Sequence, residues 1–261
     1  MVRLLALINA DGIVTKETKY GDTSRILTVI TKELGRISVL AGNARRNKSG
    51  LLTATALFSY SSFTLFKGGS SSLYKLNECE LLTSFSALHE SLDGMAFASY
   101  FCDVTNTVVQ EDSPDLAQTR LLLRSLYMLC RDNPDYEKIK AVFEFRTLTI
   151  AGLLPNLSSC ADCGAVSDLI GLSPKDGCVY CSRCLSKHPE TYKINDSILA
   201  AIAYIALAQE KKEFSFNMSD TSIKYLSELG ECCIQTLLEK NFKTLDYLRR
   251  VTALMQPAAG R

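Results

Sequence analysis

The sequence predicts an α+β protein in which a five-stranded barrel comes first and helices carrying an inserted cysteine module follow. Three observations support this prediction. Up to about residue 83, β-branched and aromatic residues occur in short runs separated by glycine-containing turns. From Ser84 onward, apolar residues recur at the spacing of an amphipathic helix. Between two groups of helices, cysteines occur in Cys-x-x-Cys pairs, which is the spacing of zinc ligands.

Five strands are expected in the N-terminal part. The clearest hairpin has Gly35 in its turn, where glycine can adopt the left-handed conformation that a tight turn requires. Strands and turns this closely spaced are typical of a small closed barrel. The expected strands cover residues 1–8, 25–31, 36–41, 56–66 and 73–82.

The helices have recognisable start signals. Ser113-Pro114-Asp115 and Asn133-Pro134-Asp135 each combine a capping side chain, a proline in the first turn and an acid at the positive end of the helix dipole. Gly152 is expected to end the helix that the second motif opens. The expected helices cover residues 84–109, 113–130, 133–151, 195–209 and 219–240, and the tail to residue 255 has mixed character.

Five of the ten cysteines lie close together, in the pattern Cys160-x-x-Cys163 followed by Cys178-x-x-Cys181-x-x-Cys184. Two Cys-x-x-Cys pairs about this far apart predict one structural Zn²⁺ held by four thiolates. A catalytic zinc needs an open position, whereas five cysteines leave a surplus of ligands.

The second pair of ligands is ambiguous. Cys181 and Cys184 are favoured, with Cys160 and Cys163, because Gly177 forms a turn just upstream. Cys178 would then be a buried neighbour of the site. Its replacement of Cys181 or Cys184 as a ligand stays open at this point.

The composition describes a globular protein with a sizeable core, since 47% of the 261 residues are hydrophobic and 22% are charged. The remaining cysteines are scattered through apolar stretches, as in a reducing compartment. No apolar run approaches the roughly 20 residues that cross a bilayer. We therefore expect a soluble cytoplasmic protein with no membrane partner. With two histidines and no nucleotide-binding or hydrolase motif, it is not expected to be an enzyme.

Charge is segregated although the net charge is only +1. Residues 34–77 contain no acid, and residues 76–119 contain no Lys or Arg. The basic block predicts an anionic partner, namely nucleic acid on a barrel surface. The alternative role for Arg25 is an ion pair with Asp22. The candidate nucleic-acid-binding residues are Arg36, Arg45, Arg46, Lys48 and Arg25.

Aromatic side chains on the barrel strands have two possible roles. Tyr60, Phe63, Phe66 and Tyr74 would stack on bases if they faced outward. Core packing is favoured for Phe63 and Phe66, because aromatics on barrel strands mostly fill the barrel.

Several segments resemble the bacterial RecO family of recombination mediators. They are Gly12–Lys16, Tyr20–Leu27, Leu34–Ala41, Ala44–Arg46, Leu153–Pro155 before Cys160-x-x-Cys163-Gly164, the pair Cys181-x-x-Cys184, and Lys243–Leu248. The resemblance covers nearly the whole chain in the same order. Cys178 departs from it, because family members commonly have glycine there.

The resemblance implies an N-terminal OB-fold, a helical C-terminal domain and a zinc module. It also implies a nucleoid-associated protein of the RecF pathway of recombinational repair. Such a protein binds single- and double-stranded DNA, anneals complementary strands, and associates with RecR and with the C-terminal tail of SSB, so that RecA is loaded indirectly. Arg120, Arg124 and Arg146 are candidates for that acidic tail.

The expected organisation is an OB-fold barrel in residues 1–83, a helical domain in 84–155 and 191–261, and a zinc module in 156–190. The expected function is that of a non-enzymatic DNA-binding mediator. One alternative is a zinc-stabilised protein–protein adaptor with weak DNA affinity. Another is a nuclease or hydrolase that uses the metal.

Overall fold

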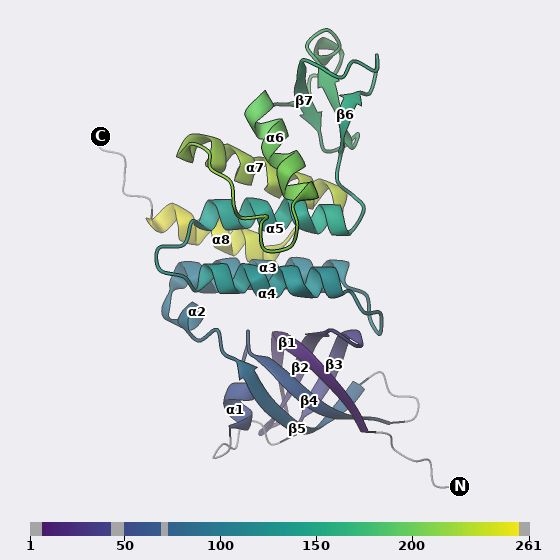
Figure 1. Cartoon of the computed structure of the whole chain (residues 1–261). Helices are drawn as coiled ribbons and strands as arrows, with labels where there is room; N and C mark the ends of the chain where they lie inside the picture. Colours follow the sequence, from purple (N-terminus) through teal and green to yellow (C-terminus); the bar gives the residue numbers. More distant parts are fainter. Residues whose placement is uncertain (1–6, 43–49, 69–72, 256–261) are drawn as a thin grey trace. The chain divides into compact units, whose positions relative to one another are not determined.

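The chain forms two compact units in a computed structural model that describes residues 7–42, 50–68 and 73–255. The first unit combines residues 1–131 with residues 243–261, and the second comprises residues 132–242. The predicted boundaries at residues 83, 155 and 190 follow changes of secondary structure. The packing instead places the first helices and the last helix in the same unit as the barrel (Figure 1).

The first unit contains the predicted five-stranded closed barrel, with strand order β1-β2-β3-β5-β4. Neighbouring strands are antiparallel except for β3 and β5, which are parallel and close the barrel. Alternate residues such as Leu27, Val29 and Val39 point inward and are fully buried. The strands are β1 Leu7–Tyr20, β2 Ser24–Thr31, β3 Gly35–Ala41, β4 Tyr60–Lys67 and β5 Leu73–Thr83.

The predicted strand at residues 56–66 begins later than expected, at Tyr60, and a one-turn helix, α1 Leu51–Ala54, precedes it. The Ser59 hydroxyl donates to the Thr53 carbonyl and the Ser61 hydroxyl to the Ala54 carbonyl. These two hydroxyls supply hydrogen bonds to backbone carbonyls at the C-terminal end of α1. A single turn is too short to show helical periodicity, so the sequence pattern does not reveal it.

Gly35 turns the chain between β2 and β3 with φ of +68°, as the sequence predicts. A second constraint is visible only in the structure. A side chain at this position would collide with the backbone of Ser113, which lies directly against the turn. The turn therefore requires glycine both for its conformation and for this close approach.

Gly35→Ala should consequently destabilise the first unit strongly, by roughly 2–4 kcal/mol, because it combines left-handed strain with a steric clash against backbone. Chemical denaturation followed by circular dichroism measures the change. Gly21→Ala is the matched control, since Gly21 has φ of +59° but open space around it. Equal losses for the two variants would contradict the steric part of the argument.

Four helices complete the first unit: α2 Ala87–Glu90, α3 Leu92–Val108, α4 Leu116–Leu129 and α8 Lys243–Met255. The single helix predicted over residues 84–109 is broken at Ser91, which is extended and caps α3 by accepting a hydrogen bond from the Gly94 amide. The predicted capping residue of the next helix is also corrected. Asp115, and not Ser113, caps α4 by accepting from the Gln118 amide.

The tail of mixed character is the amphipathic helix α8. Leu245, Leu248 and Val251 are buried on one side, and α8 packs against α3. This packing joins the end of the chain to its first half.

The second unit contains α5 Tyr136–Ile150, α6 Asp196–Leu207 and α7 Asp220–Leu237, which pack together although a small sheet separates α5 from α6 in sequence. Asp135 caps α5, and Gly152 ends it with φ of +69° as predicted. In the interior of the second unit, the Nζ of Lys140 lies 3.1 Å from a carboxylate oxygen of Glu144 and 3.1 Å from one of Glu231. No helix among residues 7–42, 50–68 and 73–255 is long and apolar enough to cross a membrane.

Candidate metal centre and nucleic-acid surface

The cysteine module is a four-stranded sheet with the order β6-β8-β7-β9. Its first knuckle follows β6, where the Gly164 amide donates to the Cys160 carbonyl and Gly164 adopts φ of +73°. Its second knuckle follows β8, where the Cys184 amide donates to the Cys181 carbonyl. The strands are β6 Asn156–Cys160, β7 Leu169–Ser173, β8 Cys178–Cys181 and β9 Tyr192–Lys193, and a short 3-10 helix η1 covers Leu185–Lys187.

The two knuckles bring four sulfurs together. The thiols of Cys160, Cys163, Cys181 and Cys184 all lie within 4.8 Å of one another, and all but Cys163 are buried. The sulfurs of Cys163 and Cys181 are 3.6 Å apart. Thiolates on a tetrahedral zinc at about 2.3 Å would be separated by about 3.8 Å. A cluster of this size can hold a metal ion.

The electrostatics of the cluster also favour a cation. The backbone amide of Cys181 donates to the Cys160 sulfur and, with the amides of Cys163 and Asp162 and against the effect of burial, lowers the pKa of that thiol to about 6. Burial and hydrogen bonds with the neighbouring thiols raise the pKa of Cys184 to about 12. Ionised thiols this close repel one another, so a divalent cation is needed for all four to be thiolates.

Cys178 lies outside the four-sulfur group. It begins β8, pairs with Asn156 and Ser173, and its thiol interacts with the Tyr180 hydroxyl. It is partly exposed, whereas the sequence suggested a buried neighbour. The geometry therefore matches the favoured pairing of Cys181 with Cys184.

His188 supports the module from outside. Its ring stacks on Tyr180 with centroids 3.7 Å apart, and its Nε2 lies 3.2 Å from the carboxylate of Asp162, inside the first knuckle.

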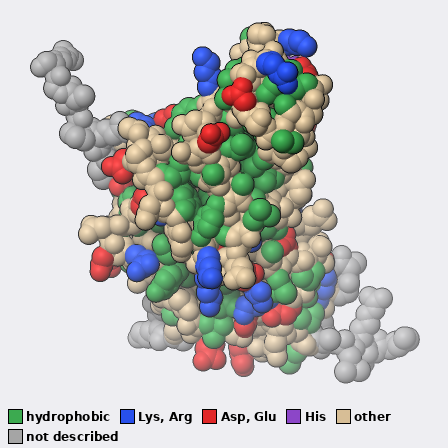
Figure 2. All heavy atoms as spheres, turned by 45° about the horizontal axis from the view of Figure 1, so that its top comes forward, with side chains coloured by type: hydrophobic (Ala, Val, Ile, Leu, Met, Phe, Trp, Pro, Cys, Tyr) green, Lys and Arg blue, Asp and Glu red, His purple; other side chains and the backbone are tan. Residues whose placement is uncertain are grey.

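Lys and Arg side chains stand out from the surface of this module (Figure 2). The side chains of Lys175 and Lys187 are 77% and 70% exposed.

The candidate nucleic-acid-binding residues fall into two groups. Arg45, Arg46 and Lys48 lie outside the described residues. Arg36 and Arg25 are on strands and have internal partners. The side chain of Arg25 is 17% exposed and donates to Glu17 at 2.8 Å, a carboxylate different from the suggested Asp22.

Arg36 joins the barrel to the C-terminal end of α3. Its Nη1 donates to the Asn106 carbonyl at 2.8 Å, and its Nη2 lies 3.4 Å from Glu111. A guanidinium at the negative end of a helix dipole is stabilising. Its backbone extends this junction, because Arg36 donates to the Gln110 carbonyl and accepts from the Asp112 amide. A role of Arg36 in DNA contact stays a prediction, beside this structural one.

Two further lysines lie on an exposed part of the barrel. Lys16 and Lys19 are exposed on β1, and neither has an ion-pair partner among the described residues. Lys19 pairs in register with Arg25, and Arg25 pairs with Ala41 at the end of β3. Ala41, the last residue of β3, therefore lies at the end of the barrel that carries Lys19. Strand register supplies this proximity, which charge counting along the sequence does not reveal.

Two of the four aromatic side chains fill the core, whereas Tyr60 and Phe66, for which core packing was favoured only in the case of Phe66, are half-buried. Phe63 and Tyr74 are buried, and the Tyr74 hydroxyl donates to Asp112. Tyr60 is half-buried with Lys32 over its ring at 5.2 Å. Core packing is thus confirmed for Phe63, and Tyr74 joins it there.

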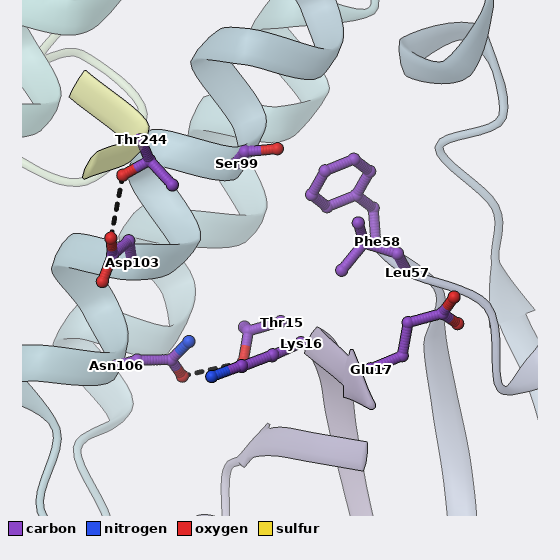
Figure 3. A pocket seen from close by; sticks show the side chains of 9 residues that line it. All are labelled: Thr15, Lys16, Glu17, Leu57, Phe58, Ser99, Asp103, Asn106 and Thr244. Carbon is purple, nitrogen blue, oxygen red and sulfur yellow. Dashed lines mark hydrogen bonds between the residues drawn. The ribbon is translucent and has the colours of Figure 1, made fainter. Parts of the chain in front are cut away.

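A cleft of about 320 Å³ lies where β1 meets α3 and α8. Figure 3 shows Asn106 and Thr15 pointing toward one another across it, with a hydrogen bond of 2.8 Å between them. A second bond, of 2.9 Å, joins Thr244 of α8 to Asp103 of α3. The first bond joins the barrel to α3 and the second joins α8 to α3, so the cleft lies at the junction between the barrel and these helices.

The fold and the cysteine cluster together define a class of protein in which a five-stranded barrel is joined to helices, and the helices carry a four-cysteine module. Comparison with known proteins specifies the class further. The family model "Recombination protein O N terminal" matches residues 5–85, and "Recombination protein O C terminal" matches residues 89–246.

Relatives of similar length support the same assignment. A protein named "DNA repair protein RecO" from Acetivibrio thermocellus is 35% identical over 243 residues, which cover 93% of this chain and 96% of the relative. A protein of the same name from Alkaliphilus metalliredigens is 31% identical over 248 residues, covering 94% and 100%. The chain belongs to the RecO family of DNA repair proteins.

Proposed function

We propose that this protein is a recombination mediator that binds single- and double-stranded DNA and anneals complementary strands. Together with RecR, it would help to load RecA onto DNA coated with SSB, whose C-terminal tail it would contact. The observation that carries the proposal is the match to the RecO family over both halves of the chain. The segregated charge of the barrel supports it independently of that match.

The proposed mechanism is electrostatic and needs no covalent chemistry. Two DNA strands repel each other through their phosphates, and this repulsion opposes pairing. Cations on one surface release counterions from both strands and lower the repulsion. We propose that Arg45, Arg46 and Lys48 contact the phosphates, as do Lys19 and Arg25 at the Ala41 end of β3 and Arg36 at the opposite end of that strand.

We propose that the four-cysteine cluster holds one structural Zn²⁺. Cys160, Cys163, Cys181 and Cys184 would be its ligands, because a four-thiolate donor set is typical of structural zinc. The metal would stabilise a small sheet between α5 and α6 that has few buried apolar residues of its own. It would have no catalytic part.

Binding of a labelled single-stranded oligonucleotide over a series of salt concentrations tests this function against the adaptor alternative. A mediator with several phosphate contacts should lose affinity as salt rises. The logarithm of the binding constant should fall against the logarithm of the salt concentration with a slope of about −0.7 per phosphate contact. We expect at least four contacts, hence a slope of about −3 or steeper. A flat salt dependence together with weak binding would contradict the proposal and favour the adaptor.

A further inference from the structure

Helix α4 carries a second cationic surface that the barrel does not include. Arg120, Arg124 and Arg131 follow one another along or just beyond α4, at spacings of one and two helical turns. Leu116 and Tyr127 share the same side and are 46% and 64% exposed. We call these five residues the α4 face.

The opposite side of α4 fixes this orientation. It is buried, and α4 packs against α3. The core therefore occupies one side of the helix and leaves the α4 face directed outward. The buried residues are Gln118, Thr119, Leu121, Leu122, Ser125, Leu126 and Leu129.

The positive charge of the α4 face is not offset by acids within the helix. Residues 116–131 contain no Asp or Glu, and the acids that flank this segment are Asp115 and Asp132. Arg146 of α5 does not belong to this face, because its guanidinium donates to the carbonyls of Ile205 and Ala206.

We propose that the α4 face binds a single strand of nucleic acid and is a second strand site, separate from the barrel surface. This inference rests on the proposed function, because pairing two strands requires that both be held by the protein. One strand would lie on the barrel and the other along α4.

The chemistry of the α4 face suits a single strand. Arg120 and Arg131 are separated by about 16 Å along the helix axis, which several phosphates of one strand can follow. An exposed Tyr127 between arginines offers a ring on which a base can stack. Duplex bases are already stacked on each other, so the aromatic contact favours single-stranded over double-stranded DNA.

Binding stoichiometry tests the proposal with short oligothymidylates, which cannot pair with each other. The full-length wild-type chain should bind two strands. The variant R120E/R124E/R131E should bind one, with the affinity of the remaining site changed less than about threefold, and should lose at least about tenfold in annealing rate. The control K175E/K187E/K193E makes the same change in net charge on the cysteine module and should still bind two strands.

Tyr127→Ala tests the stacking contact without changing charge. It should weaken single-strand binding at the second site on the order of tenfold and leave duplex binding unchanged. Tyr247→Ala, which removes a 43% exposed tyrosine from α8, is the control and should have no such effect. Circular dichroism of each variant verifies folding.

The outcomes separate this inference from the proposed function. If wild type neither binds DNA nor anneals it, the proposed function fails. If wild type anneals and the α4 variant still binds two strands, only the second strand site is overturned. Loss of binding to an acidic, apolar-ended peptide with unchanged DNA stoichiometry would also overturn it and would reassign the α4 face to a protein partner.

Discussion

Cys160→Ser is expected to release the metal and unfold the cysteine module. Zinc binding to sites of four protein ligands stabilises small modules by about 10–16 kcal/mol, and the sheet of this module has little core to replace that energy. Zinc content should fall from about one ion per chain to near zero, measured by elemental analysis of the purified protein. Amide exchange over β6 and β8 should accelerate, while the barrel keeps its protection.

Cys178→Ser is the matched control, because Cys178 lies in the same module but outside the group of four sulfurs. It should keep its zinc and its amide protection. A variant of Cys178 that loses the metal, together with a Cys184→Ser variant that keeps it, would contradict the ligand set. The same result would place the second ligand pair at Cys178 and Cys181.

Reversing the charge of Arg45 and Arg46 is expected to weaken DNA binding by on the order of tenfold or more at fixed moderate salt. Removing two phosphate contacts should also make the salt slope shallower by about 1.4. Fluorescence anisotropy of a labelled single strand over a salt series measures both quantities. Weaker binding with an unchanged slope would mean that these arginines do not contact phosphates.

K211E/K212E provides the control for R45E/R46E, because it reverses two adjacent, exposed cations in a loop of the second unit. Its salt slope should equal that of wild type. An equal loss in both variants would attribute the effect to net charge and contradict a localised surface on the barrel.

The barrel could be predicted because its signals are local. Gly35 and the alternation in β2 and β3 specify a hairpin without knowledge of the rest of the chain. The four-cysteine cluster could be predicted for the same reason, since each Cys-x-x-Cys pair forms its own knuckle. The sequence favoured Cys184 over Cys178, and the pairing of β8 with β6 and β7 determines which sulfurs converge.

Other features depend on contacts between distant segments. The partner of Arg36 at the end of α3 is 70 residues away, so charge counting treated this arginine as unpaired. The break at Ser91 was hidden because apolar residues on both sides keep a helical spacing. The helical character of α8 could have been predicted, because Leu245, Leu248 and Val251 already recur at helical spacing in the sequence.

Annealing of complementary strands coated with SSB, with and without RecR, tests the central claim most directly. We predict that the full-length protein accelerates annealing of the coated strands, and that the acceleration decreases with rising salt and in R45E/R46E. RecR should change the rate on coated strands. A protein that binds single strands yet leaves the annealing rate at its spontaneous value in every condition would contradict the proposed mediator function.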